Sequence, residues 1–245
     1  MYFLLSGEGV TDMGSGQGAA MICEGRDFRV GPMATIVAKV VEARHGYSIL
    51  SGACGYVSRS SLAEHAGVVK ANSKQLRLPG KKQPRETRYY FNNARILASL
   101  AMKKAAELQD EVVAVLFRDS DGTASAGRGE WAAKWDSMLQ GFAEEGFNMG
   151  VPMVPKPKSE AWLICALKSQ PYQNCAALEQ RSGNDDSPNN LKAELTKLLG
   201  GAATPQQLVD KVNQAVAVDR IQMPSFNRFR ERLEKVITNR GRRNQ

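Results

Sequence analysis

The sequence predicts an α/β fold with a mostly parallel sheet and helices on its faces. The run Val112–Phe117 is continuously apolar and rich in β-branched residues, which is typical of a strand buried on both faces of a parallel sheet. Two further apolar runs, residues 2–5 and 147–154, are separated from it by segments whose apolar residues have helical spacing. Strands that alternate with helices in this way indicate a largely parallel sheet.

Helical periodicity predicts most of the remaining elements. Pro32 suits the first position of a helix, and the segment after residue 169 is expected to be mostly helical, broken by a polar loop and by Pro205 and Pro224. Residues 51–88 are rich in glycine, serine and basic residues and are predicted to be a loop. Helices are expected at 33–44, 92–109, 130–145 and 159–168, and a short strand at 47–50.

A chain of 245 residues suffices for one α/β domain with an appendage. We predict an α/β domain over 1–168, with a basic loop insertion at about 51–90, and a helical, basic extension over 169–245 packed on the same domain. No run approaches the roughly 20 apolar residues that span a bilayer, so no membrane segment is expected. The apolar start ends at Ser6 and lacks a basic region, which indicates a buried strand rather than a signal peptide.

The four cysteines form no Cys-x-x-Cys pair, and only His45 and His65 accompany them, so no structural zinc site is expected. Scattered cysteines in a chain of this size fit reduced thiols in a cytosol better than a disulfide framework. We therefore expect a cytoplasmic protein. Cys54 has no identifiable base to activate it as a nucleophile.

The formal net charge of +8 is concentrated in two segments. Residues 70–88 hold seven basic residues and one acidic residue. Residues 226–243 hold seven basic residues and two acidic residues. Such segregation predicts a polyanion partner, and the two segments would follow a DNA or RNA backbone without reading bases. The alternative is two solvated basic surfaces.

Carboxylates follow two of the predicted strands at their carboxyl ends, where parallel sheets bind ligands. Glu8 lies between two glycines after the first strand, and Asp119 and Asp121 follow the strand that ends at Phe117. Oxygen ligands of this kind suit a hard divalent cation, which would also relieve the repulsion between the carboxylates. The alternative for Asp119 and Asp121 is an Asp-rich turn.

A further acid, Glu160, is expected in the first turn of a helix capped by Ser159, after the third predicted strand. It either complements the helix dipole or faces the same crevice as the other carboxylates. In the second case Lys156 or Lys158 would lie near a scissile phosphate. Asp12 is either a helix cap or a further ligand.

Four short motifs follow one another along the chain, and they are Glu8-Gly9-Val10-Thr11-Asp12, Asp119-Ser120-Asp121-Gly122, Glu160-Ala161-Trp162-Leu163 and Met223-Pro224-Ser225-Phe226. In this order they resemble the TOPRIM catalytic domain, which type II topoisomerases, bacterial primases and nucleases of the overcoming-lysogenization-defect type share. The chain is most similar to small bacterial TOPRIM-like proteins, and the resemblance covers most of its length.

The resemblance implies a TOPRIM-like fold and a nuclease that depends on Mg²⁺ or Mn²⁺. It implies a role in defence against phage and an ATPase protein partner. Many relatives carry a glutamate where this chain has Asp12. The chain shows no separate domain that would supply a topoisomerase tyrosine, and none of the template- and zinc-binding parts of a primase. The implied ligands are Glu8, Asp12, Asp119, Asp121 and Glu160, with Lys158 as a further catalytic candidate.

Two other functions remain open. The segment from Asp119 to Thr123 resembles the first motif of haloacid-dehalogenase phosphatases, in which the first aspartate is a nucleophile and the second a general acid/base. That reading gives Glu8 and Glu160 no role and needs a later acidic pair, for which Asp185-Asp186 lies in a polar loop. Alternatively, the chain is a non-catalytic module that binds nucleic acid or a partner protein.

Overall fold

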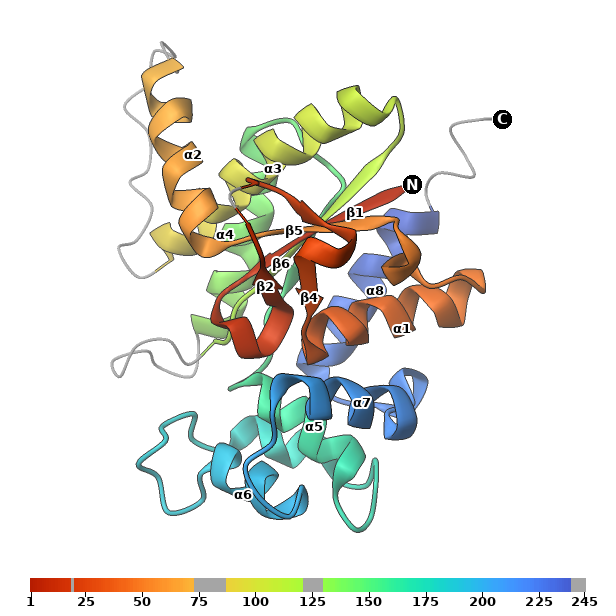
Figure 1. Cartoon of the computed structure of the whole chain (residues 1–245). Helices are drawn as coiled ribbons and strands as arrows, with labels where there is room; N and C mark the ends of the chain where they lie inside the picture. The colour runs from red at the N-terminus through yellow and green to blue at the C-terminus, as the bar shows by residue number, and fades with distance from the viewer. Residues whose placement is uncertain (19, 73–86, 121–129, 239–245) are drawn as a thin grey trace.

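The computed structural model describes residues 1–18, 20–72, 87–120 and 130–238, and places a five-stranded sheet at the centre of the chain (Figure 1). The sheet has the order β3-β5-β1-β6-β7, in which β3 is antiparallel to β5 and the other neighbours are parallel. The α/β prediction with a mostly parallel sheet is therefore confirmed. The strands are β1 (Tyr2–Gly7), β3 (Cys23–Glu24), β5 (Cys54–Val57), β6 (Val112–Phe117) and β7 (Gly150–Met153).

The register of the inner strands sets which residues meet at the carboxyl edge of the sheet. Gly7 of β1 pairs with Phe117 of β6, and Phe117 pairs in turn with Met153 of β7. All six residues of β6 are buried, as its continuous apolar sequence predicts. Because these strands end level with one another, the segments that follow them start side by side.

Helices cover both faces of this sheet (Figure 1). The helices predicted at 33–44, 92–109, 130–145 and 159–168 are confirmed with small shifts of their ends. Pro205 and Pro224 stand at the first positions of α7 and α8, where a missing amide donor costs nothing. The helices are α1 (Pro32–His45), α2 (Arg59–Asn72), α3 (Arg88–Leu108), α4 (Glu130–Glu144), α5 (Ser159–Leu167), α6 (Leu191–Leu198), α7 (Pro205–Ala215) and α8 (Pro224–Thr238).

The region between α1 and α3 differs from the sequence prediction. Residues 47–50 are not a strand, because the chain forms the 3₁₀ turn η3 (Ile49–Ser51) there. The strand is β5, and it lies with α2 inside the segment predicted to be a loop. Neither element was predicted, because a segment rich in glycine and serine is typical of a loop. Ser58 caps the start of α2, since its Oγ accepts a hydrogen bond of 3.1 Å from the amide of Ser61.

The glycine-rich segment after β1 is also ordered. It forms a single π-helical turn, η1 (Gly9–Met13), and then the short strand β2 (Gly14–Gly16), which pairs antiparallel with β4 (Phe28–Val30). This small two-stranded sheet leads the chain into α1. The residues after Glu8 are therefore held in place by η1 and by the pairing of β2 with β4.

The C-terminal part of the chain shares the buried core with the sheet region. Phe226 and Phe229 of α8 pack on Trp162 of α5, with ring centroids 4.9 and 5.8 Å apart from it. No helix in the described part of the chain is long and apolar enough to span a bilayer.

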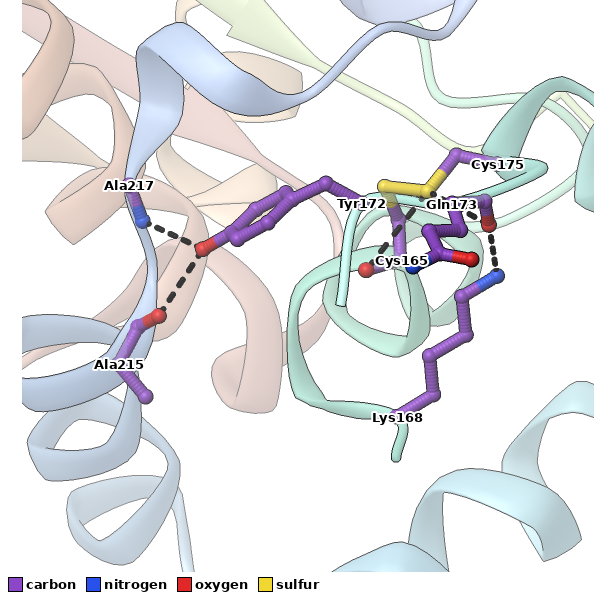
Figure 2. Close-up of a disulfide and its surroundings, with 7 residues drawn as sticks. All are labelled: Cys165, Lys168, Tyr172, Gln173, Cys175, Ala215 and Ala217. Atoms are coloured by element: carbon purple, nitrogen blue, oxygen red, sulfur yellow. Dashed lines mark hydrogen bonds between the residues drawn. A yellow bond between two sulfur atoms is a disulfide. The ribbon is translucent and has the colours of Figure 1, made fainter. Parts of the chain in front are cut away.

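Two of the cysteines are bonded, so the expectation of four reduced thiols is wrong for this pair. Cys165 at the end of α5 and Cys175 at the start of η4 (Cys175–Gln180) form a disulfide with a Cα–Cα distance of 5.2 Å (Figure 2). The chain turns back on itself after α5, which no cysteine spacing pattern signals. Cys23 and Cys54 are free and buried.

Candidate acidic site at the carboxyl edge of the sheet

The segments that leave β6 and β7 are bound together by backbone hydrogen bonds. The amide of Arg118 donates to the carbonyl of Met153 at 3.0 Å, directly beyond the paired strands. The amide of Ser120 donates to the carbonyls of Pro155 and Pro157 at 3.2 and 3.1 Å. These bonds hold the Asp119 segment against the residues that lead into α5.

Ser159 joins three of the predicted acids. Its amide donates to Oδ1 of Asp119 at 2.9 Å, and its Oγ donates to Oδ1 of Asp12 at 2.8 Å. Oε2 of Glu160 lies 3.4 Å from the same hydroxyl. Ser159 was predicted to cap α5, but Lys158 is the capping position and Ser159 is the first helical residue. Its hydroxyl and its free first-turn amide are thus both available to the carboxylates.

Burial and neighbouring charge act on Asp12. The pKa of Asp12 is raised to about 6, mainly because burial desolvates the carboxylate and also because the negative charges of Glu160 and Glu8 lie nearby, against the lowering effect of the Ser159 hydrogen bond. The charges of Glu8 and Glu160 thus both act on Asp12, while Ser159 joins Asp12 to Asp119. A cation bound among them would remove this penalty.

The turn that carries Asp12 requires a glycine at its first residue, Gly9. Gly9 has a φ of +81°, and a Cβ at that position would lie 2.6 Å from Oδ2 of Asp12. The absence of a side chain at Gly9 therefore leaves room for the carboxylate of Asp12.

Glu8 lies at the end of β1 and is held by a cation of the protein itself. The guanidinium of Arg118 forms an ion pair with Oε2 of Glu8 and stacks on the ring of Tyr89, with 3.8 Å from Cζ to the ring centroid. Sequence reasoning missed Arg118. A signal was present, since a residue directly after β6 must lie beside the residue directly after β1 in a parallel pair.

A buried lysine on α4 also reaches the site and was missed. Lys134 is 2% exposed, and its Nζ donates to the backbone carbonyl of Ser120. Tyr90 lies nearby and donates from its hydroxyl to the carbonyl of Asp119 at 3.0 Å. The sequence signal is that Lys134 stands on the apolar face that Trp131 and Trp135 define, where a lysine needs a buried partner.

Lys158 forms an ion pair with an acid that is not among the predicted ligands. Its Nζ forms an ion pair of 2.7 Å with Asp185, in the polar loop ahead of α6. This hydrogen bond lowers the pKa of Asp185. The loop that carries the acidic pair of the phosphatase alternative therefore lies beside the first turn of α5.

Asp121 lies outside the described residues. Among the residues that are described, no group of three or more histidine, cysteine, aspartate or glutamate side chains is arranged to hold a metal ion as it stands. The donors are nevertheless all carboxylates, the ligand type that Mg²⁺ and Mn²⁺ prefer. The donor chemistry thus fits such a cation, whereas Glu8 would have to exchange Arg118 for it.

The described part of the second basic segment is largely committed to the fold. Arg228 pairs with Asp136 at 3.0 Å and lies over the ring of Trp135 at 4.9 Å. Arg230 donates to the carbonyl of Val218 at 3.1 Å, and Arg232 donates to those of Gly150 and Asn148. Residues 73–86 and 239–245, which hold most of the other basic residues of the two segments, lie outside the described part.

The fold is thus an α/β sheet with an acidic cluster at the carboxyl edge of its parallel strands. Comparison with family models, with curated proteins and with solved structures gives no match for this chain. The TOPRIM resemblance accordingly stays a prediction from the motifs.

Proposed function

We propose that the chain is a divalent-metal-dependent phosphodiester hydrolase that acts on DNA or RNA. The observation that carries the proposal is the gathering of Asp12, Asp119 and Glu160 around Ser159, with Glu8 at the adjacent strand end. A cluster of carboxylates at the carboxyl edge of a parallel sheet is where this architecture binds and transforms ligands. Burial of Asp12 among like charges favours a cation there.

In this proposal the ligands of Mg²⁺ or Mn²⁺ come from Glu8, Asp12, Asp119, Asp121 and Glu160. The metal, when bound, supplies activation of water and stabilisation of the leaving oxygen.

The residues around the ligands orient them. Ser159 fixes the direction of two carboxylates through its amide and its hydroxyl. Lys134 and Tyr90 hold the backbone of Ser120 and Asp119. Hydrogen bonds made to the ligating side chains or to their backbone restrict the conformations of these residues before the metal binds.

The resemblance to the nucleases of the overcoming-lysogenization-defect type supports two additions to the proposal. One is a protein partner with ATPase activity, and the other is a role in defence against foreign DNA. Both rest on the motifs rather than on any contact described above.

The proposal is tested by incubating the protein with a panel of single- and double-stranded DNA and RNA, with Mg²⁺, with Mn²⁺ or with EDTA. Cleavage is expected only with metal. The double variant Asp119→Ala, Asp121→Ala should abolish it, whereas Asp219→Asn, which removes an exposed acid on the η5 turn (Val218–Arg220), should leave it unchanged. Equal cleavage by the wild type and the double variant would contradict the proposal.

The phosphatase alternative has its own readout. A small phosphomonoester is offered to the wild type and to Glu8→Ala. Turnover that survives in Glu8→Ala would favour the phosphatase, because that mechanism gives Glu8 no role. Loss of nucleic-acid cleavage in Glu8→Ala, without phosphomonoester turnover in either protein, supports the phosphodiester hydrolase.

A further inference from the structure

Two arginines meet at one aromatic ring beside the acidic cluster. Arg59 is the first residue of α2, and Tyr89 is in the first turn of α3. The guanidinium carbons of Arg118 and Arg59 lie 3.8 and 5.7 Å from the centroid of the Tyr89 ring. A guanidinium stacked on a ring keeps its in-plane N–H groups for hydrogen bonds. Tyr89 therefore gathers two cations; one donor of Arg118 is held by Glu8, and the donors of Arg59 stay available.

Some hydrogen-bonding groups at this place have no partner within the described part of the chain. Nε of Arg118 is buried and has no hydrogen-bond acceptor. Asn93 is 9% exposed, and its side chain makes no hydrogen bond within the described part of the chain. Arg59 is exposed and forms no hydrogen bond or ion pair with the described residues. A buried donor without an acceptor, such as Nε of Arg118, costs free energy, whereas the exposed guanidinium of Arg59 is open to an acceptor from outside.

These side chains line one narrow crevice together with Glu8. The crevice does not admit a water-sized sphere, so a ligand would meet the donors at its mouth and would not insert a base. Glu8 offsets one of the two positive charges and leaves the other uncompensated. An anion with several acceptor oxygens fits this arrangement, and a phosphate is such an anion.

We propose that Arg59, Tyr89, Asn93 and Arg118 form a subsite for a backbone phosphate of a nucleic-acid strand, adjacent to the bond that the acidic cluster hydrolyses. The identity of the ligand rests on the proposed function. The guanidinium groups are the contacts to phosphate, and Tyr89 is a positioning residue that orients them. Contacts to phosphate alone carry no sequence information, so this subsite does not select bases.

The test measures binding without cleavage. A short, fluorescently labelled single-stranded oligonucleotide is titrated in EDTA, and its anisotropy is followed at several salt concentrations. Arg59→Gln should weaken binding by roughly tenfold or more, as loss of a hydrogen bond to a charged group implies. The slope of log affinity against log salt should become shallower by about 0.7, because one fewer counterion is released. Arg59→Lys, which keeps the charge but not the planar fork, should recover part of the affinity.

A matched control separates the subsite from general electrostatics. Arg44→Gln removes the same charge from an exposed position in the last turn of α1 and should change affinity little. Tyr89→Leu should weaken binding, whereas Tyr89→Phe should retain it. If Arg59→Gln and Arg44→Gln reduce affinity equally, the subsite is overturned.

Failure of this inference is distinguishable from failure of the proposed function. Metal-dependent cleavage that Arg59→Gln and Arg44→Gln leave equally intact, with equal binding, overturns the subsite alone. Binding that depends on Arg59, in a wild type that never cleaves with Mg²⁺ or Mn²⁺, overturns the hydrolase and supports the phosphate subsite.

Discussion

A buried lysine side chain is stable only if it finds a hydrogen-bond acceptor. The buried Nζ of Lys134 donates to the carbonyl of Ser120. Lys134→Met keeps much of the volume and removes the donor. We expect the free energy of unfolding to fall by about 1–3 kcal/mol, because a buried carbonyl loses a charged partner. Metal-dependent cleavage should fall further than stability alone explains, since the backbone next to Asp119 loses an anchor.

Chemical denaturation and a cleavage assay on the same sample check this. Lys103→Met, at an exposed position on α3, is the control and should change neither quantity. Full activity in Lys134→Met would show that Lys134 does not help to position Asp119.

Glu179 is 4% exposed and accepts hydrogen bonds from the amide and the hydroxyl of Ser225 at 2.8 and 2.6 Å. Burial raises the pKa of Glu179 above its usual value of 4.5, against the lowering effects of Ser225 and Lys156. The folded chain therefore binds this proton more tightly than the unfolded chain. The contribution of Glu179 to the free energy of unfolding is therefore greatest at a pH below its pKa in the unfolded chain. This contribution is lost as the pH rises through its pKa in the folded chain.

Glu179→Gln removes the titration and keeps the acceptor oxygen. The free energy of unfolding is measured by urea denaturation at several pH values from about 4 upward. The wild type should lose stability relative to Glu179→Gln as the pH rises. A difference between the two proteins that is constant with pH would contradict the assignment.

At the residue scale, the sequence predicted the position of Glu8 and Asp119 in the fold but not the residues that surround them. Glu8 and Asp119 could be placed because residues after parallel strands share one edge of the sheet. Ser159 was assigned only a capping role, and Arg118 and Lys134 were missed. Their roles depend on tertiary contacts between segments that are far apart along the chain, which periodicity does not reveal.

At the scale of elements, two of the recognised motifs turn out to touch each other. Trp162 on α5 donates from Nε1 to Oγ of Ser225 on α8 at 2.9 Å and packs on Phe226 and Phe229. The Trp-Leu and Pro-Ser-Phe motifs thus join two helices. Through α5 they support Ser159 and Glu160 at the site.

Ser225→Ala leaves both Glu179 and the indole N–H of Trp162 without this partner. We expect a loss of about 1–3 kcal/mol in the free energy of unfolding, as for other buried groups left unsatisfied. Ser60→Ala, at an exposed position near the start of α2, should cost much less. Equal losses in the two variants would show that the buried network contributes nothing specific.

The disulfide closes a short loop between α5 and η4. Within this loop, the hydroxyl of Tyr172 donates to the carbonyl of Ala215 at 3.0 Å and accepts from the amide of Ala217 at 2.8 Å (Figure 2). The bond therefore restrains a segment that contacts the end of α7.

Mass spectrometry of the non-reduced protein should show Cys165 linked to Cys175, with Cys23 and Cys54 free. The variant Cys165→Ala, Cys175→Ala should lose about 2–3 kcal/mol of stability, because the unfolded chain is no longer closed over a loop of this length. A protein purified with four free thiols, equal in stability to the variant, would contradict the bond.

Element prediction succeeded where one pattern dominated and failed where patterns were mixed. Val112–Phe117 has a single reading as a buried strand. Cys54–Val57 is as buried, but it contains a glycine and lies among serines and glycines that are typical of turns. Its strand conformation comes from pairing with β1 and β3 on its two sides, which the local sequence does not encode.

At the scale of the whole molecule, the two predicted parts of the chain share one buried core. Helix α8 packs along β7, and α7 packs along α1. The boundary predicted at residue 168 would leave Trp162 and the outer side of β7 uncovered if the chain ended there. Removal of large aromatic contacts from a core typically costs about 3–5 kcal/mol for a single side chain.

A fragment of residues 1–168 is therefore expected not to fold on its own. Circular dichroism and tryptophan fluorescence should show no cooperative thermal transition for the fragment, whereas the full chain should unfold in one transition that both probes report together. The comparison is informative because α5, which carries Ser159 and Glu160, is present in both proteins. A fragment with a cooperative transition of its own would mean that the C-terminal helices are an accessory to the sheet, and the acidic cluster could then be assembled without them.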